Sequence, residues 1–169
     1  MRRVIDPLSR MGVRIDSQDG KPPLQVQPVD GLTAVDLKLT VASAQVKSAL
    51  LLAGLYADGE TRVTEPAPTR DHTERMLAAF GVQVGREGAT ASVRGGQVLR
   101  AARVDVPADI SSAAFFLVAA AICPGSDLIL RHVGMNPTRI GVLHVLRAMG
   151  ADITESNPQL VGGEPVADL

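Results

Sequence analysis

Arg10-Met11-Gly12-Val13-Arg14-Ile15 is the stretch that decides how this chain folds, because two further segments repeat its pattern. These segments are Ala79-Phe80-Gly81-Val82-Gln83-Val84 and Ala148-Met149-Gly150-Ala151-Asp152-Ile153. Their glycines, Gly12, Gly81 and Gly150, are separated by 69 residues each time. A spacing this regular indicates an internal repeat, in which each copy is one supersecondary unit.

The same offset of 69 residues relates other positions without any gap. The matching positions are Leu8, Leu77 and Leu146; Pro68-Thr69-Arg70 and Pro137-Thr138-Arg139; Val35-Asp36-Leu37 and Val104-Asp105-Val106; and Ser43-Ala44 and Ser112-Ala113. The chain therefore holds between one and a half and two copies of the unit.

Hydrophobic periodicity and turn residues predict the elements of one complete unit. In chain order they are a strand over 35–37, a helix over 43–56, a strand over 60–65, a helix over 69–80, and strands over 82–84 and 89–94. Thr69 is expected to cap the second helix and Gly81 to end it. The fold class is α/β (α+β) with the order β-α-β-α-β-β, and a second copy of the same order is expected from about Ala101.

The first helix of each copy lacks a polar face over most of its length. Residues 49–56 and 112–122 consist almost entirely of Ala, Leu, Val, Ile and Phe. A helix that is apolar all round is typically buried on every side, so we expect each unit to bury this helix behind its sheet. The helices over 69–80 and 138–149 carry Arg, His and Glu and are expected to be half exposed.

Composition excludes several classes of protein. The 169 residues are 46% hydrophobic and 21% charged with a formal net charge of −1, which gives no general attraction to nucleic acid or to an anionic membrane. No apolar leader follows Met1, and the most apolar run, Ala113–Cys123, is too short to span a bilayer. A cytoplasmic location is expected. The single cysteine, Cys123, is expected to be a small buried hydrophobic residue at the end of a helix.

Polar residues that carry chemistry lie at the start of the first apolar helix. Ser43, Gln45 and Lys47 occupy its first turn, where free backbone N–H groups and the positive end of the helix dipole favour a phosphate or carboxylate. One alternative is that Ser43 only caps the helix, because Ser112 keeps the same place in the second copy. Capping does not explain Gln45 and Lys47, which are Ala114 and Phe116 there. Lys47 could instead be a solvated residue at the helix edge.

Two arginines, Arg70 and Arg139, follow a Pro-Thr pair just before a helix. A cation at this end of a helix is unfavourable and needs an anionic partner. We expect a structural ion pair for Arg139, whereas the partner of Arg70 could be Asp71, Glu74 or a ligand. His72 has no second His or Cys at ligand spacing, so no metal site is predicted. From its residues alone, the chain is predicted to bind an anion.

A longer set of motifs resembles the 5-enolpyruvylshikimate-3-phosphate (EPSP) synthase family. The resemblance covers nearly all of the chain. Its motifs are the run Ser43–Leu55, which begins Ser43-Ala44-Gln45-Val46-Lys47-Ser48-Ala49; Glu65-Pro66; the run Thr69–Leu77, which begins Thr69-Arg70-Asp71-His72-Thr73-Glu74-Arg75; Asp109–Phe116; Asn136-Pro137-Thr138-Arg139; and Gly162-Gly163-Glu164-Pro165.

The resemblance implies a fold and a reaction. The family has two globular halves, each built from three β-α-β-α-β-β units with buried helices, an arrangement also described as an inside-out α/β barrel. It transfers the enolpyruvyl group of phosphoenolpyruvate to shikimate 3-phosphate without a metal or organic cofactor. Carried over, the resemblance assigns Ser43 to the shikimate phosphate, Ala44 to a close or backbone contact, Gln45 to a bridge between the substrates, and Arg70 to shikimate 3-phosphate.

The chain departs from the family in what it lacks. Family motifs that supply the general acid/base and most of the phosphoenolpyruvate site have no counterpart in this sequence, so the 169-residue chain is expected to be a central fragment, inactive alone, with no catalytic residue. Residues 1–100 would be the last unit of one half, with the end of the unit before it. Residues 101–169 would hold the hinge crossing, near 98–108, and the first unit of the other half.

Two other functions stay open from the sequence. One is a non-catalytic repeat module that binds anions or self-associates, although full-length family members are usually monomeric. The other is the related transferase that acts on UDP-N-acetylglucosamine, which lacks the Ser43–Ala49 and Thr69–Arg75 motifs. What the chain does alone would discriminate a module from an enzyme.

Overall fold

The computed structural model describes all residues from Met1 to Leu169. Contacts within the chain divide it into two compact units, Met1–Ala101 and Ala102–Leu169. The expected boundary between residues 100 and 101 lies one residue away. The assignment of these units to two halves of a larger protein stays a prediction.

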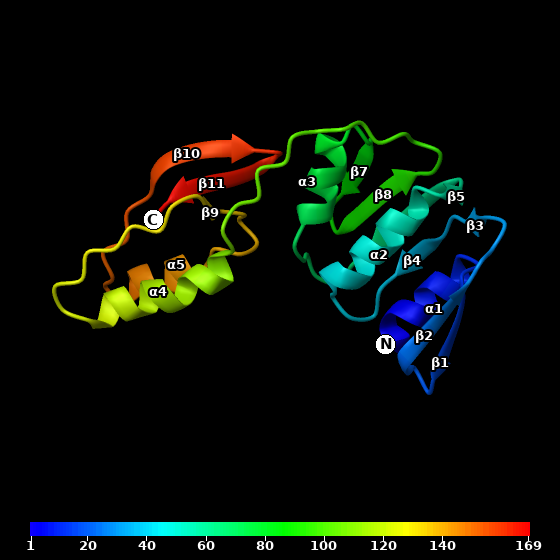
Figure 1. Ribbon diagram of the computed structural model, residues 1–169, viewed down its shortest axis with the longest axis horizontal. Helices are drawn as coiled ribbons and strands as arrows, with labels where there is room; N and C mark the ends of the chain where they lie inside the picture. The colour runs from blue at the N-terminus through cyan, green and yellow to red at the C-terminus, as the bar shows by residue number, and fades with distance from the viewer. The chain divides into compact units, whose positions relative to one another are not determined.

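The first unit contains three helices and eight strands (Figure 1). Its elements are α1 (Arg2–Arg10), β1 (Arg14–Gln18), β2 (Lys21–Gln27), β3 (Leu32–Thr33), β4 (Asp36–Lys38), α2 (Ala44–Gly54), β5 (Ala57–Asp58), β6 (Glu60–Thr64), α3 (His72–Ala79), β7 (Val84–Glu87) and β8 (Thr90–Arg94). Its main sheet has the order β4-β6-β8-β7, in which only β4 and β6 run parallel. Over residues 36–94 the predicted order β-α-β-α-β-β is confirmed for the main-sheet strands and their helices, and the short β5, which pairs with β3, is an addition.

The core of the first unit lies between α2 and the main sheet. Leu50 and Leu51 of α2 and Val63 and Val93 of β6 and β8 are at most 1% exposed. Gly54 allows the close approach, because a Cβ there would lie 2.8 Å from the Thr61 side chain. Helix α2 ends at Gly54, two residues before the predicted end at Tyr56.

The strand expected over 82–84 begins later, as β7 at Val84. Two of its residues are used by the turn that follows α3. The Val82 N–H bonds the Leu77 carbonyl oxygen at 2.9 Å, and the Gln83 N–H donates to Gln97 Oε1 at 2.7 Å. Neither N–H is free to join a strand ladder.

The three repeated segments form the same helix ending. Gly12, Gly81 and Gly150 follow α1, α3 and α5 (Gly141–Ala148) with φ values of +97°, +82° and +95°, a conformation that glycine adopts without strain. In each case the N–H of the residue after the glycine donates a hydrogen bond to the carbonyl oxygen of a leucine in the last turn of the helix, as in a Schellman motif. These leucines are Leu8, Leu77 and Leu146. The repeat inferred from the sequence is thus confirmed as a structural repeat.

The second unit is a less complete copy. Its elements are α4 (Ile110–Ile122), β9 (Val133–Gly134), α5, β10 (Ser156–Val161) and β11 (Glu164–Asp168), with an antiparallel sheet of order β10-β11-β9. The prediction of a strand near Val104–Val106 was wrong. In this segment a single β-bridge forms, between Ala108 and Val133. A strand needs a partner along its length, and β9 offers two residues.

The prediction that α4 is buried all round was also wrong. Only Ile110, Ala113 and Leu117 of this helix are buried, whereas Phe115 and Phe116 are 79% and 59% exposed. Within its unit α4 packs against α5 and β9, which cover one side of the helix. Cys123, expected to be buried, is exposed because it lies at the end of α4 beyond those contacts. No helix has the length and apolar character needed to cross a membrane.

Candidate anion-binding site

The residues predicted from the Ser43–Lys47 motif gather at the start of α2. Ser43 is the N-cap, and its Oγ accepts a hydrogen bond from the Val46 N–H at 3.4 Å. The capping role is therefore confirmed. The N–H groups of Ala44 and Gln45 belong to the first turn, where the backbone offers no intrahelical acceptor and the helix dipole favours an anion. No acidic residue lies in this turn.

Gln45 is exposed and is held by a residue that the sequence analysis missed. Arg3 Nη2 of α1 donates to Gln45 Oε1 at 2.9 Å, which directs the amide nitrogen of Gln45 elsewhere. Arg3 lies 42 residues away in sequence, and no motif singles it out. Only the packing of α1 beside α2 brings the two side chains together (Figure 1).

Lys47 is neither a solvated edge residue nor a free anion ligand, contrary to both predictions. It is 3% exposed, and its Nζ lies 2.8 Å from Glu65 Oε2 and 2.8 Å from Glu74 Oε1. Both glutamates are also buried. The ammonium group already has two carboxylate partners within the protein.

Arg70 is exposed and forms no hydrogen bond or ion pair with the chain. The two acids proposed as its partners bind other cations. Asp71 lies 2.9 Å from Arg75 Nε and 2.7 Å from Arg86 Nη2, and Glu74 is paired with Lys47. Neither of the two acids that the sequence offered as partners is therefore paired with Arg70.

Thr69 does not cap α3, contrary to the prediction. The helix begins at His72 with Asp71 as its N-cap residue, and the Asp71 side chain makes no capping bond. Thr69 Oγ1 donates instead to Glu65 Oε1 at 2.5 Å. A buried carboxylate accepts this bond more strongly than a backbone group would, so the threonine turns toward Glu65.

The corresponding arginine of the second unit is satisfied internally. Arg139 Nη2 lies 2.9 Å from Asp109 Oδ1 and 2.5 Å from Ser111 Oγ, which confirms the structural ion pair. Asp109 is also the N-cap of α4, where its side chain accepts a hydrogen bond from the Ser112 N–H at 3.3 Å. The prediction that Ser112 caps this helix was therefore wrong. Partial burial raises the pKa of Asp109, but hydrogen bonds from Ser111 and Ser112 and the charge of Arg139 outweigh it and lower that pKa.

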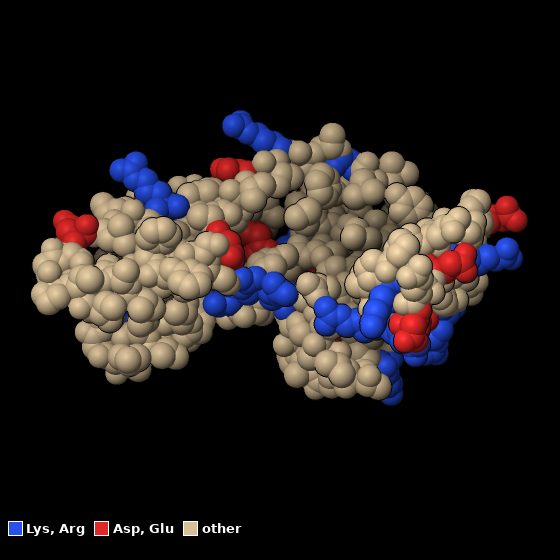
Figure 2. Space-filling model, turned by 60° about the horizontal axis from the view of Figure 1, so that its bottom comes forward, with Lys and Arg blue, Asp and Glu red and all other residues tan.

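The two units differ in charge. The first unit holds thirteen of the seventeen Lys and Arg residues and eleven of the eighteen Asp and Glu residues. Figure 2 shows Lys and Arg side chains at the surface of this part of the molecule. The second unit holds four basic and seven acidic residues, so an anion is attracted to the first unit.

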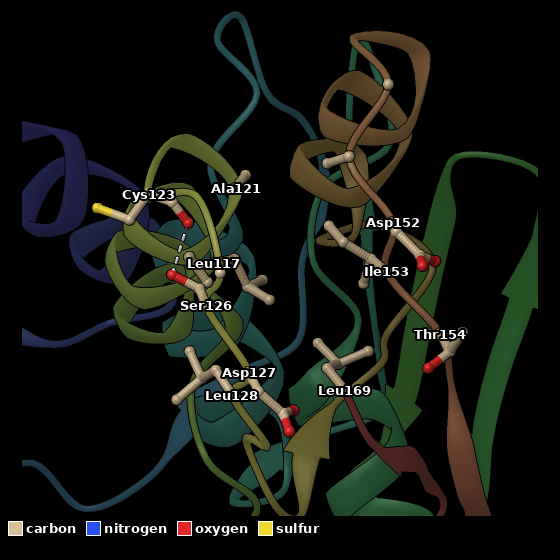
Figure 3. A pocket seen from close by; sticks show the side chains of 14 residues that line it. Leu117, Ala121, Cys123, Ser126, Asp127, Leu128, Asp152, Ile153, Thr154 and Leu169 are labelled. Atoms are coloured by element: carbon tan, nitrogen blue, oxygen red, sulfur yellow. Dashed lines mark hydrogen bonds between the residues drawn. The ribbon is translucent and has the colours of Figure 1, made fainter.

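A pocket of about 460 Å³ lies within the second unit, between the end of α4 and the segment after α5 (Figure 3). Apolar side chains, among them Leu117, Leu128 and Ile153, and two carboxylates, Asp127 and Asp152, line it. Ser126 Oγ donates to the Cys123 carbonyl oxygen at 2.8 Å. No Lys or Arg contributes to the lining, so this pocket does not suit an anion.

Comparison with known proteins matches the whole chain to one family. A family model described as EPSP synthase (3-phosphoshikimate 1-carboxyvinyltransferase) matches residues 1–166. The 3-phosphoshikimate 1-carboxyvinyltransferases of Methylococcus capsulatus and Alkalilimnicola ehrlichii are 62% and 65% identical over 170 aligned residues, covering 100% of this chain. The chain spans 39% and 38% of the length of these two relatives.

Solved structures agree with the sequence comparison. EPSP synthase from Acinetobacter baumannii superposes with a TM-score of 0.90 at 53% identity, over 99% of this chain and 38% of that structure. The predicted α/β enolpyruvyl transferase fold is thus confirmed. The chain belongs to the EPSP synthase family.

Proposed function

We propose that this chain carries part of the shikimate 3-phosphate site of an enzyme that transfers the enolpyruvyl group of phosphoenolpyruvate to that substrate. The substrate phosphate would bind at the N-terminus of α2, where the Ser43 hydroxyl and the Ala44 and Gln45 N–H groups are donors. Arg70 would neutralise its charge, and Gln45 would direct its amide toward both substrates. The family resemblance implies no metal or organic cofactor, and the donors at α2 together with Arg70 would offset part of the phosphate charge.

A comparison of the two repeats carries this proposal. In the second unit, the carboxylate of Asp109 lies at the N-terminus of α4 and pairs with Arg139 at 2.9 Å. In the first unit an uncharged residue, Ser43, is the N-cap, and Arg70 has no acidic partner. A ligand phosphate at α2 would occupy the role that the Asp109 carboxylate fills in the second unit.

The 169-residue chain alone is not expected to turn over substrate. Proton transfer requires a positioned acid or base within hydrogen-bonding reach of the reacting atoms. The buried carboxylates beside the site, Glu65 and Glu74, are paired with Lys47 and so are not available for this proton transfer.

We place the enzyme in the cytoplasm. Its partners are the two small-molecule substrates, and neither nucleic acid nor a membrane is expected as a partner.

Calorimetric titration of the chain with shikimate 3-phosphate tests the proposal. We expect saturable binding that plain shikimate does not reproduce, since the phosphate supplies the charge. Gln45→Ala should weaken the affinity about fivefold, the equivalent of losing one hydrogen bond of about 1 kcal/mol. The exposed Gln25 of β2, replaced by Ala, serves as the matched control. Equal affinity for shikimate, or an unchanged affinity in Gln45→Ala, would contradict the proposed site.

A second candidate function, self-association, is favoured by the surface of α4. Phe115, Phe116 and Ile122 are 79%, 59% and 73% exposed on one helix. Exposed apolar groups this concentrated typically mark an interaction surface. We propose that two copies of the isolated chain bury this helix against each other.

Sedimentation at rising protein concentration tests self-association. The average mass should rise with concentration for the natural sequence and stay at 17.7 kDa for the double variant Phe115→Ser/Phe116→Ser. Tyr56→Ser, which removes an exposed side chain of the first unit (76%), is the control and should associate normally. Association that persists in the double variant would exclude α4 as the contact surface.

A further inference from the structure

We infer that Lys47 is a positioning residue, which joins the first turn of α2 to the segment before α3 and thereby holds Arg70 beside the helix N-terminus. This inference rests on the proposed function, because it explains how the two parts of that anion site are kept together. The residues responsible, Lys47, Glu65, Thr69 and Glu74, are called the Lys47 cluster below.

The Lys47 cluster ties three segments to one ammonium group. Glu65 follows β6, and its N–H bonds the Ala89 carbonyl oxygen at 3.0 Å, which anchors it to the start of β8. Lys47 lies 2.8 Å from one oxygen of Glu65, while Thr69 donates to the other at 2.5 Å. Lys47 also lies 2.8 Å from Glu74 in the first turn of α3.

Arg70 is held on both sides by these contacts although its own side chain is exposed. Thr69, directly before it, is bound to Glu65, and Asp71, directly after it, is paired with Arg75 and Arg86. A further hydrogen bond of 2.6 Å joins Ser48 of α2 to Thr73 of α3. The backbone at residue 70 therefore has a defined place relative to α2, while its guanidinium stays available.

Stability alone does not account for the Lys47 cluster. It places two carboxylates against one ammonium group in the interior, and Glu74 Oε2 has no hydrogen-bond partner. Burying such groups costs desolvation energy that well-packed apolar residues would not incur. A retained buried network of this kind is better explained by the arrangement it imposes.

The second unit shows that the repeat folds without such a cluster. At the 69-residue offset, Lys47, Glu65 and Glu74 correspond to Phe116, Gly134 and Leu143. The hydrogen-bonded pair Ser48 and Thr73 corresponds to Leu117 and Val142. In that unit Arg139 is positioned by its own ion pair with Asp109. The Lys47 cluster thus occurs in the unit whose arginine lacks an internal partner.

The test removes the charges of the Lys47 cluster together, because a single change would leave buried carboxylates unpaired. In the triple variant Lys47→Met/Glu65→Gln/Glu74→Leu, the glutamine introduced by Glu65→Gln can still accept from Thr69, and Glu74→Leu matches the apolar second unit. We expect a folded protein in which the amides of Glu65 and Arg75, whose N–H groups bond the Ala89 and Asp71 carbonyl oxygens, exchange hydrogen at least tenfold faster. Lys38→Met, at an exposed lysine of β4, is the control and should leave exchange unchanged.

Shikimate 3-phosphate affinity provides the second readout. The triple variant should bind about tenfold more weakly, and Arg70→Gln should then weaken binding by less than twofold further, because a misplaced Arg70 contributes little. A full additive effect of Arg70→Gln, or unchanged exchange at Glu65 and Arg75, would overturn the inference. If the natural chain binds no shikimate 3-phosphate, the proposed function fails, and the exchange rates still decide whether Lys47 positions this segment.

Discussion

Lys47→Met alone is expected to lower the free energy of unfolding by about 3–5 kcal/mol, the usual effect of removing one partner from a buried ion pair. The methionine would fill the space of the lysine stem but leave Glu65 and Glu74 without their shared cation. Both glutamates are at most 5% exposed, so water cannot solvate them in place of the ammonium. The folded state alone bears this cost.

Urea unfolding followed by far-ultraviolet circular dichroism measures this effect, since the chain has no Trp. Lys38→Met is the matched control, and a surface change of this kind should stay within about 0.5 kcal/mol. The triple variant should recover most of the loss because it removes the unpaired carboxylates. A loss below about 1 kcal/mol in Lys47→Met would show that the glutamates find other partners or take up protons.

Arg70→Gln is expected to weaken the binding of shikimate 3-phosphate by about 10- to 100-fold, corresponding to about 1.5–3 kcal/mol for a hydrogen bond to a charged group. Glutamine keeps a donor but loses the positive charge and the paired donors with which arginine binds phosphate. Folding should be unaffected, because Arg70 is exposed and makes no internal ion pair.

Arg139→Gln, in the second repeat, is the matched control for Arg70→Gln. Arg139 follows the same Pro-Thr pair but is bound to Asp109 and Ser111. Its replacement should lower the stability of the second unit without changing the affinity for shikimate 3-phosphate. Calorimetry on both variants measures the two affinities. Equal losses of affinity would show that the effect comes from total charge rather than from a site at Arg70.

Local patterns of sequence were sufficient for much of the fold. The repeat, the order β-α-β-α-β-β of the main sheet and its helices, and Gly81 as the end of α3 were predicted correctly. Each depends on residues close in the chain, such as the Leu77 carbonyl that bonds the N–H of Val82. The placement of Ser43 at the cap of α2 belongs to the same class.

Predictions that depended on distant partners were decided by the tertiary structure. The position of Lys47 in the helix pattern is the same whether its side chain faces solvent, a ligand or two glutamates. Its actual partners, Glu65 and Glu74, lie 18 and 27 positions further along the chain. Arg3 meets Gln45 only because α1 packs beside α2. The apolar pattern of α4 indicated which of its side chains could be buried. It did not indicate that only α5 and β9 would cover the helix, on one side.

The sequence by itself therefore determined the family, the repeat and the helix N-terminus proposed to bind an anion. Only the tertiary structure decided which charged side chains are left for a ligand. The physical reason is that an ionic group is satisfied by whichever opposite charge lies within a few ångströms, and for Lys47, Asp71 and Arg139 that charge comes from another element or turn. Arg70 was singled out in the sequence. That it lacks an internal partner became known only from the structure, in which Asp71 and Glu74 pair with other cations.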